Sequence, residues 1–210
     1  AGKTTCFNML GGQLRPDRGS IRLDGRELVG LRPREIAHLG VGRTFQITAT
    51  FASMSVRENV QMALIARHRR TLAPWPRADG LYVEEAMALL ARVGIAGEAA
   101  RTCGTLAYGD LKCLELAVGL ANDPRLLLMD EPTAGMAPRE RVALMALTAE
   151  IVHARGMSVL FTEHDMDVVF AHADRIIVLD RGQLIAEGAP HRVREDARVR
   201  EIYLGQAESA

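Results

Sequence analysis

The sequence is poor in cysteine, aromatic residues and long apolar runs, and neither sign of charge is in excess. Three cysteines without CxxC spacing among 210 residues offer neither a disulfide framework nor a zinc site, which fits a reducing compartment. No run approaches the ~20 apolar residues of a membrane-spanning helix, and we expect no secretory signal. Because 26 basic and 26 acidic residues balance, no sequence-wide field favours nucleic acid or anionic lipid. If the protein acts at a membrane, we expect it to reach the membrane through a partner.

The patterns that are present alternate between helix and strand, which is typical of an α/β domain. Apolar runs at 126–129 and 158–162 are typical of buried parallel strands, and 41–45 is expected to be extended. Hairpins are predicted over 20–29 and 175–187. Helical spacing and capping signals predict helices over 3–14, 33–40, 55–69, 81–93, 111–121, 138–155, from about 165, and near 193–204. The helix-rich middle, 47–124, reads as a subdomain inserted into the α/β core.

The chain opens with Ala1-Gly2-Lys3-Thr4-Thr5, the second half of the phosphate-binding pattern G-x-x-x-x-G-K-[ST]. In such a loop, backbone N–H groups at the helix start face phosphates, and Lys3 would reach the β and γ phosphates. The Thr4 hydroxyl would hold Mg²⁺. A bare GKT also occurs by chance, so a simple polar helix start is the alternative.

Two carboxylates, Asp130 and Glu131, follow directly on the apolar run at 126–129. The ends of buried parallel strands are where ligands bind, so Asp130 could coordinate Mg²⁺ through water and Glu131 could act as general base on an attacking water. A strand running into an acidic turn is the alternative. The co-occurrence with Gly2-Lys3-Thr4 favours the catalytic interpretation.

Two further polar residues follow predicted strands. His164 comes after 158–162, where an imidazole could hydrogen-bond a γ-phosphate, although an isolated histidine is more often structural. Gln46 comes after 41–45 and could contact Mg²⁺ or the attacking water, and its alternative is an exposed amide at a loop entrance.

Taken in order, these segments resemble the motifs of ABC ATPases over nearly the whole chain. The motifs are Gly2-Lys3-Thr4-Thr5 (end of Walker A), Gln46 (Q-loop), Leu106-Ala107-Tyr108-Gly109-Asp110 (signature), Leu126 to Glu131 (Walker B) and Thr162-Glu163-His164-Asp165 (switch histidine). A finer similarity, to branched-chain amino-acid importers, is carried by Tyr108, Gly42 to Gln46, Asp130 to Met136, and the tail from Glu187 to Gly205.

The resemblance implies an α/β P-loop ABC ATPase core with a parallel sheet, β-hairpins and an inserted helical subdomain, as one domain over 1–210. It implies ATP and Mg²⁺ as ligands, with Ala107, Tyr108 and Gly109 closing the nucleotide site of a partner in a head-to-tail dimer. Two different ATPase subunits, integral-membrane permease subunits and a periplasmic solute-binding protein are the implied partners, and nucleic acid is not. The implied location is the cytoplasmic face of the inner membrane, with 47–124 receiving the permease contact.

Three features depart from the family pattern. The glycine that opens the phosphate loop, the strand before it and the adenine-stacking aromatic are missing, so we expect the sequence to be a fragment lacking N-terminal strands. Ala107 stands where serine is usual, and a lost hydrogen bond to charge predicts roughly ten- to a hundred-fold weaker closure of the partner's site. Ala137 replaces a usual Asp or Asn, which could loosen coupling between sites.

Two alternatives stay open besides an importer ATPase. A soluble ABC ATPase of DNA repair or translation would be expected to carry coiled-coil insertions or tandem domains, which this compact pattern lacks. A degenerate, non-hydrolysing subunit is suggested by the missing half-loop and Ala107, whereas intact Lys3, Asp130, Glu131 and His164 argue against it.

Overall fold

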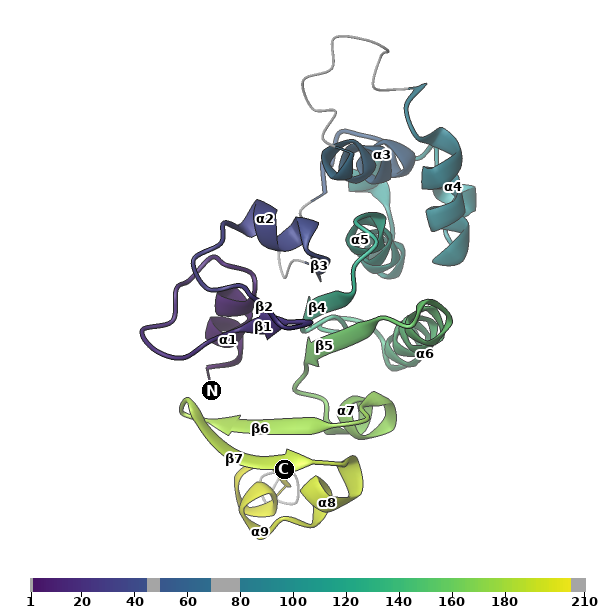
Figure 1. Ribbon diagram of the computed structural model, residues 1–210. Coiled ribbons are helices and arrows are strands. Elements are labelled where there is room, and N and C mark those ends of the chain that lie inside the picture. The colour runs from purple at the N-terminus through teal and green to yellow at the C-terminus, as the bar shows by residue number, and fades with distance from the viewer. Residues whose placement is uncertain (1, 45–49, 69–79, 205–210) are drawn as a thin grey trace.

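The computed structural model describes residues 2–44, 50–68 and 80–204, and these form an α/β fold around a parallel sheet (Figure 1). The sheet has the order β3-β4-β5, and both strand pairs are parallel. Its strands are β3 (Val41–Thr44), β4 (Leu126–Asp130) and β5 (Ser158–Thr162). Because Asp130 lies beside Thr162 in the register, the residues that follow these two strands emerge at one edge of the sheet.

Helices and two antiparallel hairpins surround this sheet. The helices are α1 (Lys3–Leu10), α2 (Pro33–His38), α3 (Val56–Arg67), α4 (Val83–Arg92), α5 (Tyr108–Ala121), α6 (Pro138–Arg155), α7 (Met166–His172), α8 (Pro190–Glu195) and α9 (Ala197–Val199). Short turns η2 (Ala96–Glu98) and η3 (Cys103–Thr105) are 3₁₀ helical, and η4 (Arg200–Leu204) is π helical. The hairpins are β1 (Arg22–Leu23) with β2 (Arg26–Glu27), and β6 (Ile176–Asp180) with β7 (Gln183–Gly188).

Side chains alternate along β4 between two apolar clusters. Leu128 packs with Phe7 of α1, Ile36 of α2 and Val41 of β3, whereas its neighbours Leu127 and Met129 belong to the cluster that includes α5 and α6. Figure 1 shows α1 and α2 on one side of the strands and α5 and α6 on the other. The residue two positions after Leu128, Asp130, therefore faces the α1 side.

The helical layer of α3, α4 and α5 forms part of the larger apolar cluster. Leu64, Leu90 and Leu114, one from each helix, are fully buried. A reciprocal cap starts α3, since Ser55 Oγ accepts from the Glu58 N–H at 3.2 Å and Glu58 Oε2 accepts from the Ser55 N–H at 2.7 Å. Helix α5 also contacts β3 and α6, so this layer is continuous with the sheet.

The predicted strands, hairpins and most helices are confirmed, with three differences at helix ends. Helix α1 stops at Leu10 rather than near 14, because the chain turns at Gly11 and Gly12. Helix α5 starts earlier than predicted, at Tyr108. The helix predicted near 193–204 is broken at Asp196, whose carboxylate accepts N–H bonds that begin a new helical turn. Across the described ranges, every helix is too short or too polar to span a lipid bilayer.

Candidate active site

Helix α1 begins at a glycine with left-handed backbone. Gly2 has φ +93°, a conformation that glycine adopts without steric cost, and its carbonyl accepts the first helical bond from the Cys6 N–H at 3.0 Å. Thr4 and Thr5 are exposed in the first turn, where N–H groups lack helical partners and attract anions. Lys3 Nζ donates to the Glu163 carbonyl at 3.3 Å. This contact brings the predicted phosphate lysine to the end of β5.

Asp130 is a buried carboxylate held by two neighbours, and its side chain is 2% exposed. Its Oδ1 accepts from Thr162 Oγ1 at 2.6 Å, and its Oδ2 forms an ion pair with Arg43 Nη2 at 3.6 Å. Arg43 is anchored on the α1 side by Asn8 Oδ1 at 2.9 Å and by Gln13. A carboxylate oxygen has two acceptor positions, so Oδ1 retains one for a further ligand, and Oδ2, which accepts no hydrogen bond from the described residues, retains both.

Glu131 contacts His164 at the edge of the sheet. His164 Nε2 lies 2.9 Å from Glu131 Oε1, and the two side chains are 70% and 24% exposed. The Glu131 N–H donates to the carbonyl and hydroxyl oxygens of Thr162, both at 3.1 Å. Its φ of +50° is unusual for a residue with a side chain and costs about 1–3 kcal/mol, as strained backbone at functional sites does. The structure therefore unites two of the predicted catalytic residues.

The turn after Glu131 is tied to the segment after β5. Glu163 Oε1 accepts from the Thr133 N–H at 2.9 Å and from Thr133 Oγ1 at 2.7 Å, in a buried position. Arg141 Nε donates to the Met136 carbonyl at 2.8 Å, and Arg141 Nη1 pairs with Asp165 at 2.8 Å. These contacts hold the Glu131 turn and the His164 segment as one unit.

The predicted signature residues lie at the start of α5. Ala107 is its N-cap residue, and Tyr108 and Gly109 are the first residues of the helix. The Tyr108 hydroxyl donates to the Ala134 carbonyl at 2.9 Å. A side chain at Gly109 would begin 3.2 Å from a carboxylate oxygen of Glu140 on α6. The three residues therefore lie beside the turn that follows β4.

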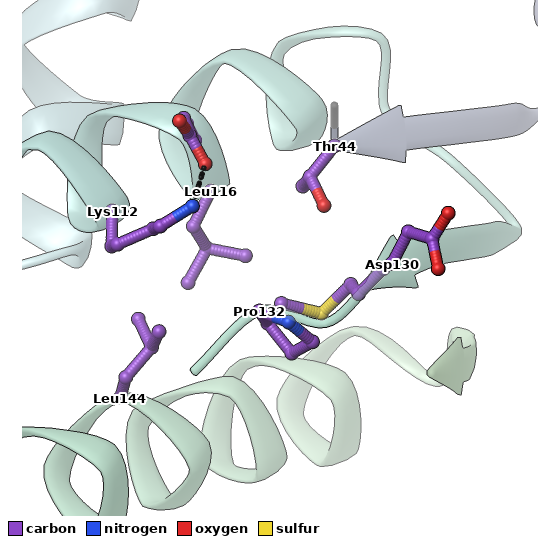
Figure 2. A pocket seen from close by; sticks show the side chains of 8 residues that line it. Thr44, Lys112, Leu116, Asp130, Pro132 and Leu144 are labelled. Carbon is purple, nitrogen blue, oxygen red and sulfur yellow. Dashed lines mark hydrogen bonds and ion pairs between the residues drawn. The ribbon is translucent and has the colours of Figure 1, made fainter. Parts of the chain in front are cut away.

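A buried ion pair on α5 lies behind this turn. Lys112 Nζ is 3.0 Å from Glu115 Oε2, and the two side chains are 9% and 8% exposed. Figure 2 shows Lys112 across a small cavity from Asp130, whose carboxylate points away from it. The cavity measures about 10 Å³, and its labelled lining residues are Thr44, Lys112, Leu116, Asp130, Pro132 and Leu144. Lys112 thus neutralises Glu115, while the Asp130 carboxylate points to the opposite side of the sheet, towards α1.

Some site residues were not predicted, and one prediction lies outside the described residues. Gln46 falls within 45–49, which the structure does not describe. Arg43, Thr162 and Glu163 support the carboxylates but were not singled out individually. Their positions at the ends of β3 and β5 were the available signal, because side chains at neighbouring strand ends meet. Within the described ranges, no cluster of three or more His, Cys, Asp or Glu residues suits a metal, and the three cysteines are free.

Comparisons with known proteins give consistent matches. The ABC transporter family model matches residues 1–134, and a model described as branched-chain amino acid ATP-binding cassette transporter matches 183–209. BraF of Pseudomonas aeruginosa, a high-affinity branched-chain amino acid transport ATP-binding protein, is 39% identical over 99% of this chain and 84% of its own length. LivG of Escherichia coli, with the same description, is 38% identical with the same coverage.

Solved structures agree with the sequence matches. An ATP-binding cassette of an ABC transporter in its ADP conformation superposes with a TM-score of 0.83 at 30% identity, over 97% of this chain and 84% of that one. A nucleotide-free cassette gives 0.81 at 28% identity, over 96% and 83%. These likenesses confirm the predicted α/β fold.

Proposed function

Because this chain belongs to the ABC transporter family, we propose that it is the ATP-hydrolysing subunit of an importer for branched-chain amino acids or a similar small solute. The observation that carries the proposal is the contact between His164 and Glu131, 2.9 Å apart at the ends of two parallel strands. A basic imidazole and a carboxylate placed there suit activation of a water against a terminal phosphate. The solute is taken from the described function of the relatives.

We propose a separate role for each site residue from its position. Lys3, on the first turn of α1, binds the β and γ phosphates together with the N–H groups of that turn. Glu131 accepts the proton of the attacking water, and His164 orients Glu131 and hydrogen-bonds the γ-phosphate. Gln46 completes this set as a contact to the attacking water, and Thr5, exposed in the first turn of α1, is a further proposed contact to the nucleotide.

The oxygen donors present fit a magnesium ion. Mg²⁺ prefers one or two protein oxygens together with waters and phosphate oxygens, and Asp130 keeps an acceptor position on each carboxylate oxygen. Thr4 provides a hydroxyl in the first turn of α1, and Gln46 is the third proposed ligand. When bound, the ion would neutralise charge that develops on the phosphates. Thr162 and Arg43 hold Asp130 in position for this role.

The proposed assembly has several subunits. We propose that the chain pairs head to tail with a second, different ABC ATPase subunit, so that Ala107, Tyr108 and Gly109 face the partner's nucleotide. The pair would act on permease subunits at the cytoplasmic face of the inner membrane, with a periplasmic binding protein supplying solute and no role for nucleic acid. The helical segment 47–124 would receive the permease contact. The relatives' description as transport ATP-binding proteins supports this assignment.

Hydrolysis and uptake measured in proteoliposomes test the proposal. The complete coding sequence, its partner ATPase and the neighbouring permease genes would be co-expressed and supplied with binding protein and labelled leucine. We expect ATP-dependent uptake that Glu131→Gln abolishes while nucleotide binding persists. Arg22→Ala, a change in the exposed β1–β2 hairpin, is the control and should leave uptake unchanged. ATPase stimulation by nucleic acid instead of permease would contradict the proposal.

A further inference from the structure

The side chain of Tyr108 joins α5 to the turn that follows Glu131 within one chain. Its hydroxyl donates to the Ala134 carbonyl at 2.9 Å. The next residue, Gly135, has φ +78°, and a side chain there would begin 3.3 Å from the tyrosine hydroxyl. Glycine at this position therefore meets two needs, since it permits the left-handed turn and leaves the ring in contact with the backbone.

Tyr108 is itself held in place from α5. Lys112 Nζ lies 5.4 Å from the centroid of the tyrosine ring, a distance that suits a cation–π contact. Lys112 is fixed in turn by its buried pair with Glu115. The ring therefore packs against a buried ion pair, while the residue as a whole is 47% exposed. Such an arrangement gives the hydroxyl a defined direction.

Other contacts hold the two ends of the turn and Thr133, which is bonded to Glu163, and Tyr108 adds a side-chain bond to Ala134. At the first end, Glu131 is bonded to Thr162, and at the second, the Met136 carbonyl accepts from Arg141. The carbonyl of Ala134, at the tip, accepts the tyrosine bond. Because the Ala134 N–H donates to the Glu131 carbonyl at 3.2 Å, displacement of Ala134 would shift Glu131, whose backbone is left-handed, and with it the carboxylate.

We propose that Tyr108 is a positioning residue for Glu131 of its own chain. The proposal rests on the proposed function and refines it, since the signature segment still faces the partner's nucleotide but the hydroxyl of Tyr108 acts within its own chain. The hydroxyl is committed to Ala134 of the same chain, so its loss affects the site built on Lys3 and Glu131. The site that the partner's own phosphate loop forms keeps its geometry.

The variant Tyr108→Phe isolates the hydroxyl. Phenylalanine keeps the ring over Gly135 and the contact with Lys112, and water can reach the freed Ala134 carbonyl because this contact is exposed. The fold should therefore be unaffected. Tyr82→Phe is the matched control, since Tyr82 is the N-cap residue of α4 and its ring stacks on His68 with ring centroids 4.6 Å apart.

The kinetic test separates the two sites of the assembled transporter. In one assembly the partner's phosphate-loop lysine is replaced by alanine, so that only the site with Lys3 and Glu131 turns over. In the other, Lys3→Ala leaves only the partner's site. We expect Tyr108→Phe to lower kcat roughly three- to ten-fold in the first assembly, with KM unchanged, since one neutral hydrogen bond is lost. The second assembly and the Tyr82→Phe variants should keep their rates.

A raised KM in the second assembly with no change in the first would overturn the proposal, because Tyr108 would then act on the partner's nucleotide. Hydrogen exchange on the isolated full-length subunit tests the contact without turnover. Tyr108→Phe should speed exchange of the amides of residues 134–136 several-fold, and unchanged exchange there would also overturn it. If the proposed function itself is wrong, the unaltered assembly would hydrolyse no ATP, and this result is distinct from both outcomes above.

Discussion

Loss of one partner from the buried Lys112–Glu115 pair should destabilise the protein strongly. The charges are 3.0 Å apart with side chains 9% and 8% exposed, and among the described residues Glu115 Oε1 has no hydrogen-bond partner. Lys112→Met leaves this carboxylate buried and unneutralised, a defect that costs about 3–5 kcal/mol. For a chain of this length, that loss corresponds to a fall in melting temperature of roughly 6–20 °C.

A double variant and a control distinguish the loss of one buried partner from the loss of charge in general. Changing Lys112→Met together with Glu115→Leu removes both charges and should restore most of the lost stability, because well-packed apolar residues replace buried ion pairs at little cost. Arg101→Met is the matched control, since its pair with Glu98 has the same 3.0 Å distance and i,i+3 spacing but is 48% and 35% exposed. Urea and thermal unfolding followed by circular dichroism measure these three variants beside the unaltered protein. Equal losses in Lys112→Met and Arg101→Met, or no recovery in the double variant, would refute the reasoning.

Three further changes have expected outcomes. Thr162→Val removes the hydroxyl that donates to Asp130 and should lower the free energy of unfolding by about 1.5–3 kcal/mol in urea titrations, whereas Thr162→Ser should lose clearly less. Ser55→Ala removes the side-chain cap of α3 and should lower the free energy of unfolding by about 1 kcal/mol in the same assay. A loss below about 0.3 kcal/mol would count against the cap. Bonds from Arg32 lower the pKa of Glu35 to about 2 from its ordinary 4.5, so its stabilising contribution is present above pH 4.5 and is lost as pH falls through about 2. Carboxyl NMR should find that midpoint, and Arg32→Ala should return it towards 4.5.

Strands and the order of motifs were predictable because their signals are local. The apolar runs that became β4 and β5 lie between turn residues, and such runs indicate buried parallel strands. Once these strands are adjacent, the residues after them meet, so the approach of Glu131 to His164 followed from position alone. The end of α6 was equally local, since Gly156 stops it where predicted.

Contacts between distant segments were beyond the sequence patterns. No periodicity connects Tyr108 with Ala134, or Arg43 with Asp130, because each pair meets only when α5 or β3 packs against β4. The left-handed backbone of Glu131 was equally hidden, since a residue with a side chain gives no local sign of positive φ. Sequence reasoning therefore found the residues proposed to act on nucleotide and missed the contacts that hold them in place.

The most direct test of the ATPase assignment is calorimetric titration of Mg-ATP into the protein made from its complete coding sequence. Lys3→Ala and Glu131→Gln would be measured beside the unaltered protein, with hydrolysis followed in parallel. The account predicts that the unaltered protein binds, that Lys3→Ala loses binding, and that Glu131→Gln binds without turnover. Absence of binding by the unaltered protein, or full turnover by Glu131→Gln, would contradict it.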